Sequence, residues 1–176
     1  MPHNAAKNGF TLIEILVVLV IIGLMAALAV FTMGGSSQQR ELEAEVQGLY
    51  LRLQVVSEQA VLNNLEAGLV IEADHYRFVM FDDETQDWRT SPERLFQAHA
   101  LPLWLSVDTA LSDDIPRLTN ETNRLQPSVV FFSSGESTAF EIELMVRGQA
   151  MNSHRLYSDG FGLIRWQKPG ARADGP

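Results

Sequence analysis

Apolar residues are concentrated near the start of this 176-residue chain. The run FTLIEILVVLVIIGLMAALAVFTM, residues 10–33, contains one charged residue, Glu14, and its apolar positions follow no helical period. A helix over this run would be about 36 Å long at 1.5 Å per residue, which exceeds the ~30 Å hydrocarbon core of a bilayer. A helix that is apolar on every side is suited to lipid or to a ring of similar helices. The pattern therefore predicts a transmembrane helix over residues 10–33.

A second pattern follows the small residues Gly34-Gly35-Ser36-Ser37, where we expect a bend. Apolar residues then recur at steps of four and three, which places them on one face of an amphipathic helix. These residues are Leu42, Val46, Leu49, Leu53, Val56 and Ala60. Asn63-Asn64 and Gly68 are typical of helix ends. We therefore expect a long helix whose second part packs one face against the rest of the chain.

The remainder of the chain has the pattern of short strands and turns. The predicted strands are residues 69–73, 76–81, 103–107, 129–132, 140–146 and 163–166. In 140–146 every second residue from Phe140 is apolar, so one face of that strand should be buried. The short connections Asp74-His75 and 134–137 predict antiparallel hairpins. Residues 110–127 predict an exposed loop, and residues 167–176 a flexible tail. The fold class is α+β.

Composition and charge narrow the classes of partner. Lys and Arg number 13 against 22 Asp and Glu, a formal net charge of −9. An acidic surface repels a phosphate backbone, so nucleic acid is not an expected partner. The chain has no cysteine, which excludes disulfides, thiolate catalysis and thiolate metal sites. The first nine residues carry Lys7 and no acid, whereas Glu41, Glu43 and Glu45 follow the apolar run. This asymmetry predicts a cytoplasmic N-terminus and an exported C-terminal domain.

Glu14 is an anomaly, because a carboxylate inside an apolar helix costs about 2.5–3.5 kcal/mol on insertion scales. A cut between Gly9 and Phe10 would create an α-amine about 6 Å away along the helix. That amine could offset Glu14 within one chain or between neighbouring chains, and pairing between chains would fix their axial register. Alternatively, Glu14 lies near the membrane interface and snorkels or becomes protonated.

The sequence KNGFTLIEILVVLVIIGLMA resembles the class III signal of type IV pilins and type II secretion pseudopilins. In that family a basic leader ends in Gly, Phe follows, and Glu is the fifth residue of the mature chain. The resemblance implies that prepilin peptidase cuts between Gly9 and Phe10, that Phe10 is N-methylated, and that Glu14 pairs with a neighbour's N-terminus during assembly. An ordinary secretory signal cut after Ala27-Leu28-Ala29 is the alternative, but its apolar core would be shorter and would lack Glu14.

The globular half most resembles the H-type minor pseudopilins. The similar stretches include VVFFSSGESTAFEIEL at 129–144 and GFGLI at 160–164, although the Phe-x-Pro-x-Gly turn common in that group lacks its proline here. The resemblance implies a pilin-like fold, in which the transmembrane helix continues into a periplasmic helix packed on antiparallel sheet. The expected domains are a cleaved leader at 1–9, the transmembrane helix at 10–33, a periplasmic domain at 34–166, and the tail at 167–176.

Side chains that could carry chemistry are scattered. The histidines His3, His75, His99 and His154 have no helical metal-ligand spacing, and we expect them on the surface or in hairpins. Ser133–Ser137 reads as a turn rather than a nucleophile elbow. Two acidic groups, 82–84 and 113–114, could bind Ca²⁺ but lack the ligand spacing of an EF-hand and fit solvated turns. We therefore predict no catalytic residue, no metal site and no cofactor.

The resemblance implies a structural subunit at or near the tip of a type II secretion pseudopilus, in the bacterial inner membrane, that supports protein export across the outer membrane. The partners it implies are other minor pseudopilins, the major pseudopilin, prepilin peptidase and exported substrate proteins. Two alternatives remain at this point. One is a type IV pilus minor pilin that primes assembly or takes up DNA through the basic residues Arg165, Lys168 and Arg172. The other is an enzyme tethered by its helix.

Overall fold

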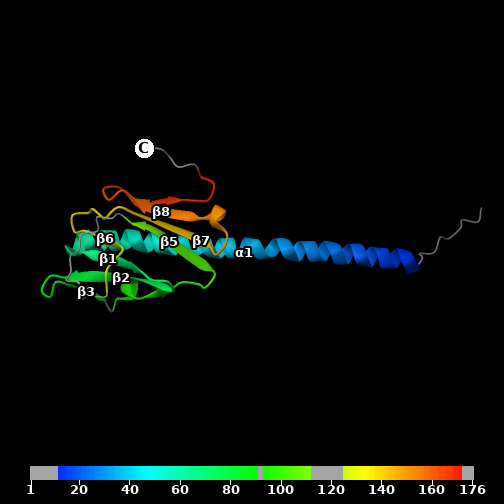
Figure 1. The fold of residues 1–176 in the computed structure, drawn as a ribbon, viewed down its shortest axis with the longest axis horizontal. Helices are drawn as coiled ribbons and strands as arrows, with labels where there is room; N and C mark the ends of the chain where they lie inside the picture. Colours follow the sequence, from blue (N-terminus) through cyan, green and yellow to red (C-terminus); the bar gives the residue numbers. More distant parts are fainter. Residues whose placement is uncertain (1–11, 91–92, 112–124, 172–176) are drawn as a thin grey trace, which may run out of the picture. The chain divides into compact units, whose positions relative to one another are not determined.

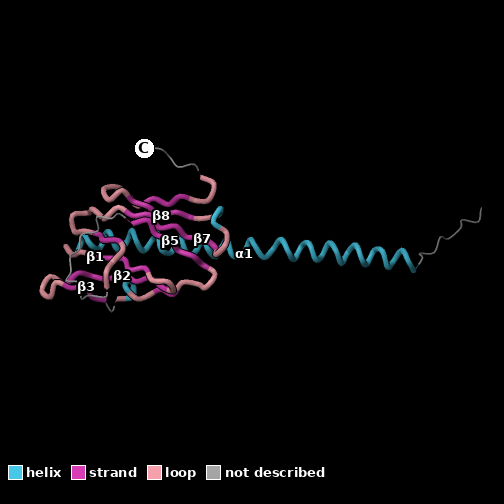
Figure 2. The backbone as a smooth tube through the Cα atoms, in the orientation of Figure 1, coloured by secondary structure: helices cyan, strands magenta, loops and turns pink. Residues whose placement is uncertain are grey.

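The structure, a computed structural model, describes residues 12–90, 93–111 and 125–171, without the side chains of residues 28–36, 95 and 111. These ranges contain one long helix, nine strands and two short 3₁₀ helices (Figures 1 and 2). In chain order they are α1 (Leu12–Asn63), β1 (Ala67–Ile71), β2 (His75–Asp82), β3 (Asp87–Thr90), η1 (Arg94–Phe96), β4 (His99–Ala100), β5 (Leu105–Leu111), β6 (Val129–Phe131), β7 (Phe140–Val146), η2 (Ala150–Asn152), β8 (His154–Ser158) and β9 (Arg165–Gln167).

The chain divides into two compact units, residues 1–40 and 41–176, and α1 contributes to both. The helical backbone of α1 continues through residues 34–37, where the sequence predicted a bend. In the second unit, strands of both sheets lie along the last turns of α1 (Figure 1).

The core of the second unit is built on the predicted stripe of α1. All six stripe residues are at most 2% exposed, which confirms the amphipathic prediction. They form one cluster with apolar residues of both sheets, among them Leu69, Phe78, Phe131 and Ile142. Burying a Leu or Val side chain contributes about 1.5–3 kcal/mol. Packing of this one helix face therefore holds the two sheets together.

Helix α1 ends in a Schellman motif. The amide of Leu65 donates to the carbonyl of Ala60 at 3.0 Å, and the amide of Asn64 donates to the carbonyl of Val61 at 3.3 Å. Asn64 has φ +51°, the left-handed conformation that this motif requires and that Asn tolerates better than most residues. The chain thereby turns sharply from the helix into β1, and the predicted helix end at Asn63-Asn64 is confirmed.

Two antiparallel sheets follow the helix. In the first, the strand order is β3-β2-β1-β6, with β4 also paired to β2, and in the second the order is β5-β7-β8-β9. Strands β1 and β2 form a hairpin, as predicted, with Ile71 opposite Tyr76, but the connection is residues 72–74 and His75 already belongs to β2. Strand β7 has the predicted bounds, and its alternate residues from Phe140 are buried. Both observations confirm α+β architecture with antiparallel sheet.

The hairpin predicted at 134–137 is confirmed only as a local antiparallel turn, because the two strands that it was expected to join, β6 and β7, do not pair with each other. Phe131 and Ser137 form an isolated antiparallel bridge across this turn, but β6 belongs to the first sheet and β7 to the second. The amide of Val130 donates to the hydroxyl of Thr138 at 3.0 Å, and the amide of Thr138 donates to the carbonyl of Val130 at 2.8 Å. These bonds extend the local pairing to Thr138, and the chain then crosses to the second sheet, where β7 begins at Phe140.

Other strand predictions are shifted or incomplete. The strands predicted at 69–73, 103–107 and 163–166 are β1, β5 and β9, each displaced by about two residues. Strands β3, β4 and β8 were not predicted. Residues 110 and 111, assigned to the exposed loop, belong to β5, and residues 112–124 lie outside the described part. The predicted tail begins at Gln167, but this residue is the last of β9 and pairs with Arg155 of β8.

Gly160 supplies a close contact between two loops, and its replacement by alanine tests that contact. Gly160 has φ +96°, and a Cβ there would lie 2.6 Å from the carbonyl oxygen of Ser137. We expect Gly160→Ala to lower the free energy of unfolding by about 2–4 kcal/mol, from the left-handed backbone and the clash together. Gly148 has φ +84° with nothing within 4 Å, so Gly148→Ala should cost only about 1–2 kcal/mol. Equal losses in urea unfolding would show that the contact with Ser137 contributes nothing.

Candidate functional site

The predicted processing and assembly residues lie at the start of α1. Gly9 and Phe10 are outside the described residues. Glu14 lies in the first turn of α1, and its side chain is exposed. The amide groups of a first helical turn are oriented to favour a carboxylate there. The helix thus offers Glu14 a favourable electrostatic position at its N-terminal end.

Every side chain of residues 12–27 is exposed, although nearly all are apolar. Ile13 is 69% exposed, Leu19 63% and Met25 68%. An apolar surface this continuous marks a site of contact with lipid or with other proteins. Within the described part of the chain, no helix is long and apolar enough to cross a membrane. The predicted span of 10–33 extends past the described side chains at both ends, and it stays a prediction.

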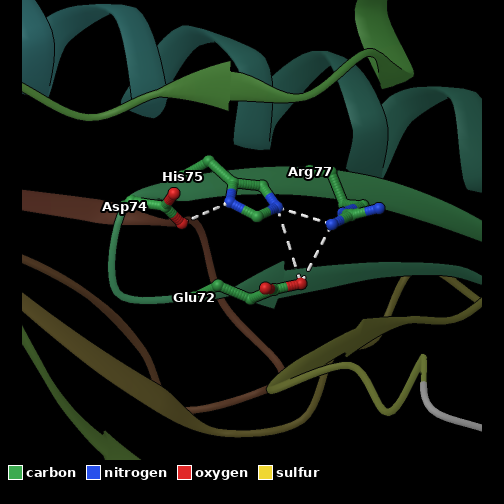
Figure 3. Close-up of polar contacts among 4 residues, drawn as sticks. All are labelled: Glu72, Asp74, His75 and Arg77. Atoms are coloured by element: carbon green, nitrogen blue, oxygen red, sulfur yellow. Dashed lines mark hydrogen bonds and ion pairs between the residues drawn. The ribbon is translucent and has the colours of Figure 1, made fainter.

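A charged cluster lies at the hairpin between β1 and β2 (Figure 3). His75 is at its centre: its Nδ1 lies 2.7 Å from Asp74 Oδ1, and its Nε2 lies 2.5 Å from an Arg77 guanidinium nitrogen. The same guanidinium nitrogen donates to Glu72 Oε1 at 2.9 Å. The ligand atoms of Glu72, Asp74 and His75 lie within 4.8 Å of one another. The cluster has the residue types of a metal site.

The geometry of this cluster favours an ion-pair network instead. Arg77 donates to His75 Nε2, which leaves Nδ1 as the protonated nitrogen that donates to Asp74. The hydrogen bond from His75 lowers the pKa of Asp74 below its ordinary value. A divalent cation would compete with the Arg77 guanidinium for both Glu72 and His75, so it would have to displace a charge already in place. The cluster therefore ties the end of β1 to the start of β2 through contacts among Glu72, Asp74, His75 and Arg77.

A second polar group ties α1 to β2 and β4. His99 Nε2 lies 2.9 Å from Glu45 Oε2, and the Arg52 guanidinium donates to the Tyr76 hydroxyl. Burial raises the pKa of Tyr76. The rings of Tyr76 and His99 are 5.0 Å apart. These side chains are used in packing the helix against the sheet.

His154 corrects the expectation that the histidines are on the surface or in hairpins. It is the first residue of β8 and is only 3% exposed, and its Nδ1 accepts a hydrogen bond from Trp166 Nε1 at 3.1 Å. This burial was not predictable locally, because the run HRLYS has no strong strand pattern and is buried through the pairing of β8 with β7 and β9. His154 therefore serves as a buried hydrogen-bond acceptor.

The stability of the domain should fall as the pH drops below about 6.5 because of His154. Burial lowers the pKa of His154 from its ordinary value of 6.5; nearby Glu43 opposes this and nearby Lys168 adds to it. The unfolded chain then binds more protons than the folded one, so this contribution is complete above pH 6.5 and is lost as the pH falls through the folded pKa. Urea unfolding between pH 7.5 and 5 should show the loss, and His154→Gln should flatten it. An unchanged slope in that variant would assign the loss to other groups.

The basic residues near the C-terminus are partly used within the domain. Lys168 Nζ lies 2.5 Å from Glu43 Oε1 and 5.0 Å from the centre of the Trp166 ring. The hydrogen bond from Lys168 lowers the pKa of Glu43. Arg165 is exposed in β9, and Arg172 lies outside the described residues. Lys168 is therefore engaged with an acid and an aromatic ring, which weakens the case for a phosphate-binding surface.

The remaining candidates are turn residues, as predicted. Asp82 Oδ1 accepts hydrogen bonds from the amides of Glu84 and Thr85, and its Oδ2 pairs with Arg89 at 3.0 Å. These amide bonds, that of Thr85 foremost, lower the pKa of Asp82. The Ser133 hydroxyl donates to Glu66 at 3.1 Å. The acidic pair at 113–114 lies outside the described residues.

Known protein families match both the N-terminal segment and the globular part of the chain. Residues 4–30 match the prokaryotic N-terminal methylation motif, and residues 45–160 match the family of the type II transport protein GspH. The chain is 35% identical to type II secretion system protein H of Pseudomonas aeruginosa, over 91% of this chain and 95% of that protein. It is 28% identical to the protein of the same name in Vibrio cholerae, over 94% and 96%. The fold is similar to that of the V. cholerae minor pseudopilin EpsH, with a TM-score of 0.62 and 22% identity, over 74% of this chain and 99% of the other.

Proposed function

This chain belongs to the GspH family of type II transport proteins, and we propose that it works at or near the tip of the secretion pseudopilus to support protein export across the outer membrane. It is a minor pseudopilin of the type II secretion system with a pilin-like α+β fold. The observation that carries the proposal is the division of α1. Its residues 12–27 are apolar and exposed, whereas its residues 42–60 bury one face in the domain. Such a subunit can pack its first half among similar helices while its domain stays outside.

The N-terminus is processed as in other prepilins under this proposal. Prepilin peptidase cuts between Gly9 and Phe10 and Phe10 becomes N-methylated; the methylation motif over residues 4–30 supports this. Before the cut the N-terminus is cytoplasmic, the helix crosses the inner membrane once, and the domain is periplasmic. Glu14 then pairs with the N-terminal amine of a neighbouring subunit. Because an axial slip leaves both charges unpaired in an apolar medium, this pair sets the register of the filament.

The partners follow from the assembly. They are the other minor pseudopilins, the major pseudopilin and, during export, the substrate protein. The role is structural and non-catalytic. The histidines that the structure describes are engaged with carboxylates, an arginine or a tryptophan, which supports this reading. The curated relatives above are secretion proteins, so we do not adopt the type IV pilus alternative.

Mass spectrometry of the chain isolated from its own cell should find an N-terminus at Phe10 carrying one methyl group. The physical reason is that only a new amine at this position lies within a helical turn of Glu14. An N-terminus at Val30 would indicate an ordinary secretory signal, and an uncut start at Met1 would leave Glu14 without the amine.

Co-purification tests the tip role. The full-length chain, solubilised in mild detergent from its own cell, should bring down several other pilin-like subunits of the same secretion system in defined stoichiometry. Recovery of the major subunit alone, in large excess, would place this chain along the shaft. Recovery of the chain by itself would remove the role in assembly.

A further inference from the structure

The loop between β8 and β9 displays two large apolar side chains. Phe161 is 82% exposed and Leu163 is 85% exposed, although Ile164 beside them is buried. Isolated exposed apolar residues are common, but two in one short loop form the centre of a patch.

The backbone of this loop is held in place. Asp159 Oδ1 accepts hydrogen bonds from the amides of Phe161 at 3.1 Å and Gly162 at 2.8 Å. The carbonyl of Gly160 accepts a hydrogen bond from the amide of Ser137 at 2.8 Å, and the amide of Gly160 donates to the Ser158 hydroxyl. A side chain presented from a fixed backbone loses less conformational entropy on binding than one on a loose loop. The loop therefore presents Phe161 and Leu163 in a pre-organised way.

A groove of about 360 Å³ lies between this loop and α1. Gln54, Ser57 and Glu58 of α1 form one wall, Gly135 lies at one edge, and Phe161 and Leu163 form the other wall. Both walls belong to the second compact unit. Val61 of α1, which is 46% exposed, lies at the Gly135 edge of the groove, since a Cβ on Gly135 would lie 3.7 Å from its Cγ2.

The charge beside this surface is negative. Among the described residues that line the groove, Glu58 is the only ionisable side chain. Glu136, next to Gly135, is also exposed. Arg165 and Lys168 line a second groove on the Tyr50 and Tyr157 side of the loop, which shares Leu163 and Ile164 with this one, so the negative charge is confined to the α1 side. A binding partner would gain by placing a cation beside Glu58.

We propose that the surface formed by Phe161, Leu163, Glu58 and Val61 binds a different pilin-like subunit, which inserts an apolar side chain flanked by Lys or Arg. The inference rests on the proposed function, because the partner is taken to be a neighbour in the filament. A second copy of this chain is a poorer partner, since its own copy of the surface is acidic and the chain carries a net charge of −9.

The absence of cysteine makes a direct test possible. Phe161→Cys in the full-length chain is a single attachment point for a benzophenone maleimide, and Leu103→Cys, at a residue that is 87% exposed elsewhere, is the matched control. Membranes from the native cell are labelled, irradiated and solubilised, and this chain is captured and its adducts identified by mass spectrometry. We expect an adduct with one other pilin-like subunit from position 161 and none from position 103.

Charge reversal tests the chemistry of the partner. Adding Glu58→Lys to the Phe161→Cys chain should lower the adduct yield at least about tenfold, because like charges would face each other. Glu84→Lys, an exposed acid in the turn between β2 and β3, should leave the yield unchanged. An unaffected yield with Glu58→Lys would overturn the proposal that the partner presents a basic side chain. An adduct with a second copy of this chain would overturn the proposal that the partner is a different subunit.

The remaining outcomes separate this inference from the proposed function. If position 161 gives no adduct while the chain still co-purifies with other pilin-like subunits, the surface is wrong and the function stands. If the chain neither forms an adduct nor co-purifies, both are overturned. Adducts with lipid or with unrelated proteins would also overturn the surface.

Discussion

Replacement of Glu14 by glutamine is expected to leave the subunit in the membrane and to remove it from the filament. Glutamine keeps the size of the side chain but removes a charge that disfavours insertion, by up to about 2.5–3.5 kcal/mol for a carboxylate at the centre of a membrane helix and by less near its end. Insertion of Glu14→Gln should therefore be at least as good as that of the natural chain. Under the proposed assembly, this variant loses the pair with the neighbour's N-terminal amine and leaves that amine uncompensated in an apolar environment, a penalty of several kcal/mol. Recovery of this chain in sheared or detergent-extracted filament fractions should fall about 100-fold or more, whereas its amount in membranes should not change.

The control is Glu41→Gln, at an exposed acid in the second unit. It removes the same charge and should leave both the membrane and the filament fractions unchanged. Equal incorporation of the Glu14→Gln and Glu41→Gln chains into filaments would show that Glu14 does not set the axial register of the subunits. A loss of Glu14→Gln from the membrane fraction itself would point to an effect on insertion instead.

Replacement of Phe78 by alanine should destabilise the domain by about 3–5 kcal/mol. Phe78 is 0% exposed in the middle of β2, and its ring meets that of Tyr76 edge to face at 6.1 Å. The substitution removes a large buried side chain and leaves a cavity between the first sheet and α1, which surrounding side chains fill only in part. Many domains of this size have a total stability of only about 5–15 kcal/mol, so the change removes a large fraction of it.

Urea unfolding of the full chain in detergent, followed by tryptophan fluorescence, measures this loss. Phe161→Ala provides the matched control, because Phe161 is 82% exposed and its removal should change stability by no more than about 0.5 kcal/mol. A comparable loss in both variants would mean that Phe161 is packed in the folded domain, against its exposure in the structure.

The stripe of α1 and the faces of β7 were predictable because their burial is periodic along the sequence. A helix or strand with one buried face repeats its apolar residues at the period of the element, whatever the rest of the fold. The end of α1 was predictable for a similar local reason, since Asn64 suits the left-handed turn found there.

Predictions failed where the deciding contact comes from a distant part of the chain. Gly68 has the appearance of a turn residue, yet it lies inside β1, where a Cβ would approach Pro127 at 2.6 Å and Trp88 at 3.1 Å. A glycine is needed there because other segments cross close to the backbone, and the sequence of β1 alone carries no sign of them. The short strands β3, β4 and β8 likewise depend on pairing with longer neighbours.

The candidate functional residues divide in the same way. Gly9, Phe10 and Glu14 were proposed from a contiguous motif, because the chemistry expected of them acts along one segment. Leu163 was assigned to a predicted strand, since an apolar residue beside Ile164 and Trp166 reads as part of one. The structure places Leu163 85% exposed in a loop that contacts of Asp159 and Gly160 hold in shape. Whether an apolar side chain in such a loop is exposed depends on contacts with distant parts of the chain, so the local sequence does not predict it.

The link between Lys168 and Glu43 also bears on when the domain can fold. It joins the last strand to the first turns of the domain's helix, across nearly the whole domain sequence. Strand β9 supplies Trp166, which contacts the Tyr50 ring and bonds to His154, so these groups lack their partner until β9 is present. A polypeptide emerging N-terminus first therefore exposes Glu43 and Tyr50 long before their partners arrive. Completion of the domain's packing therefore waits for residues near the domain's C-terminal end, and contacts of such large sequence separation form late in folding.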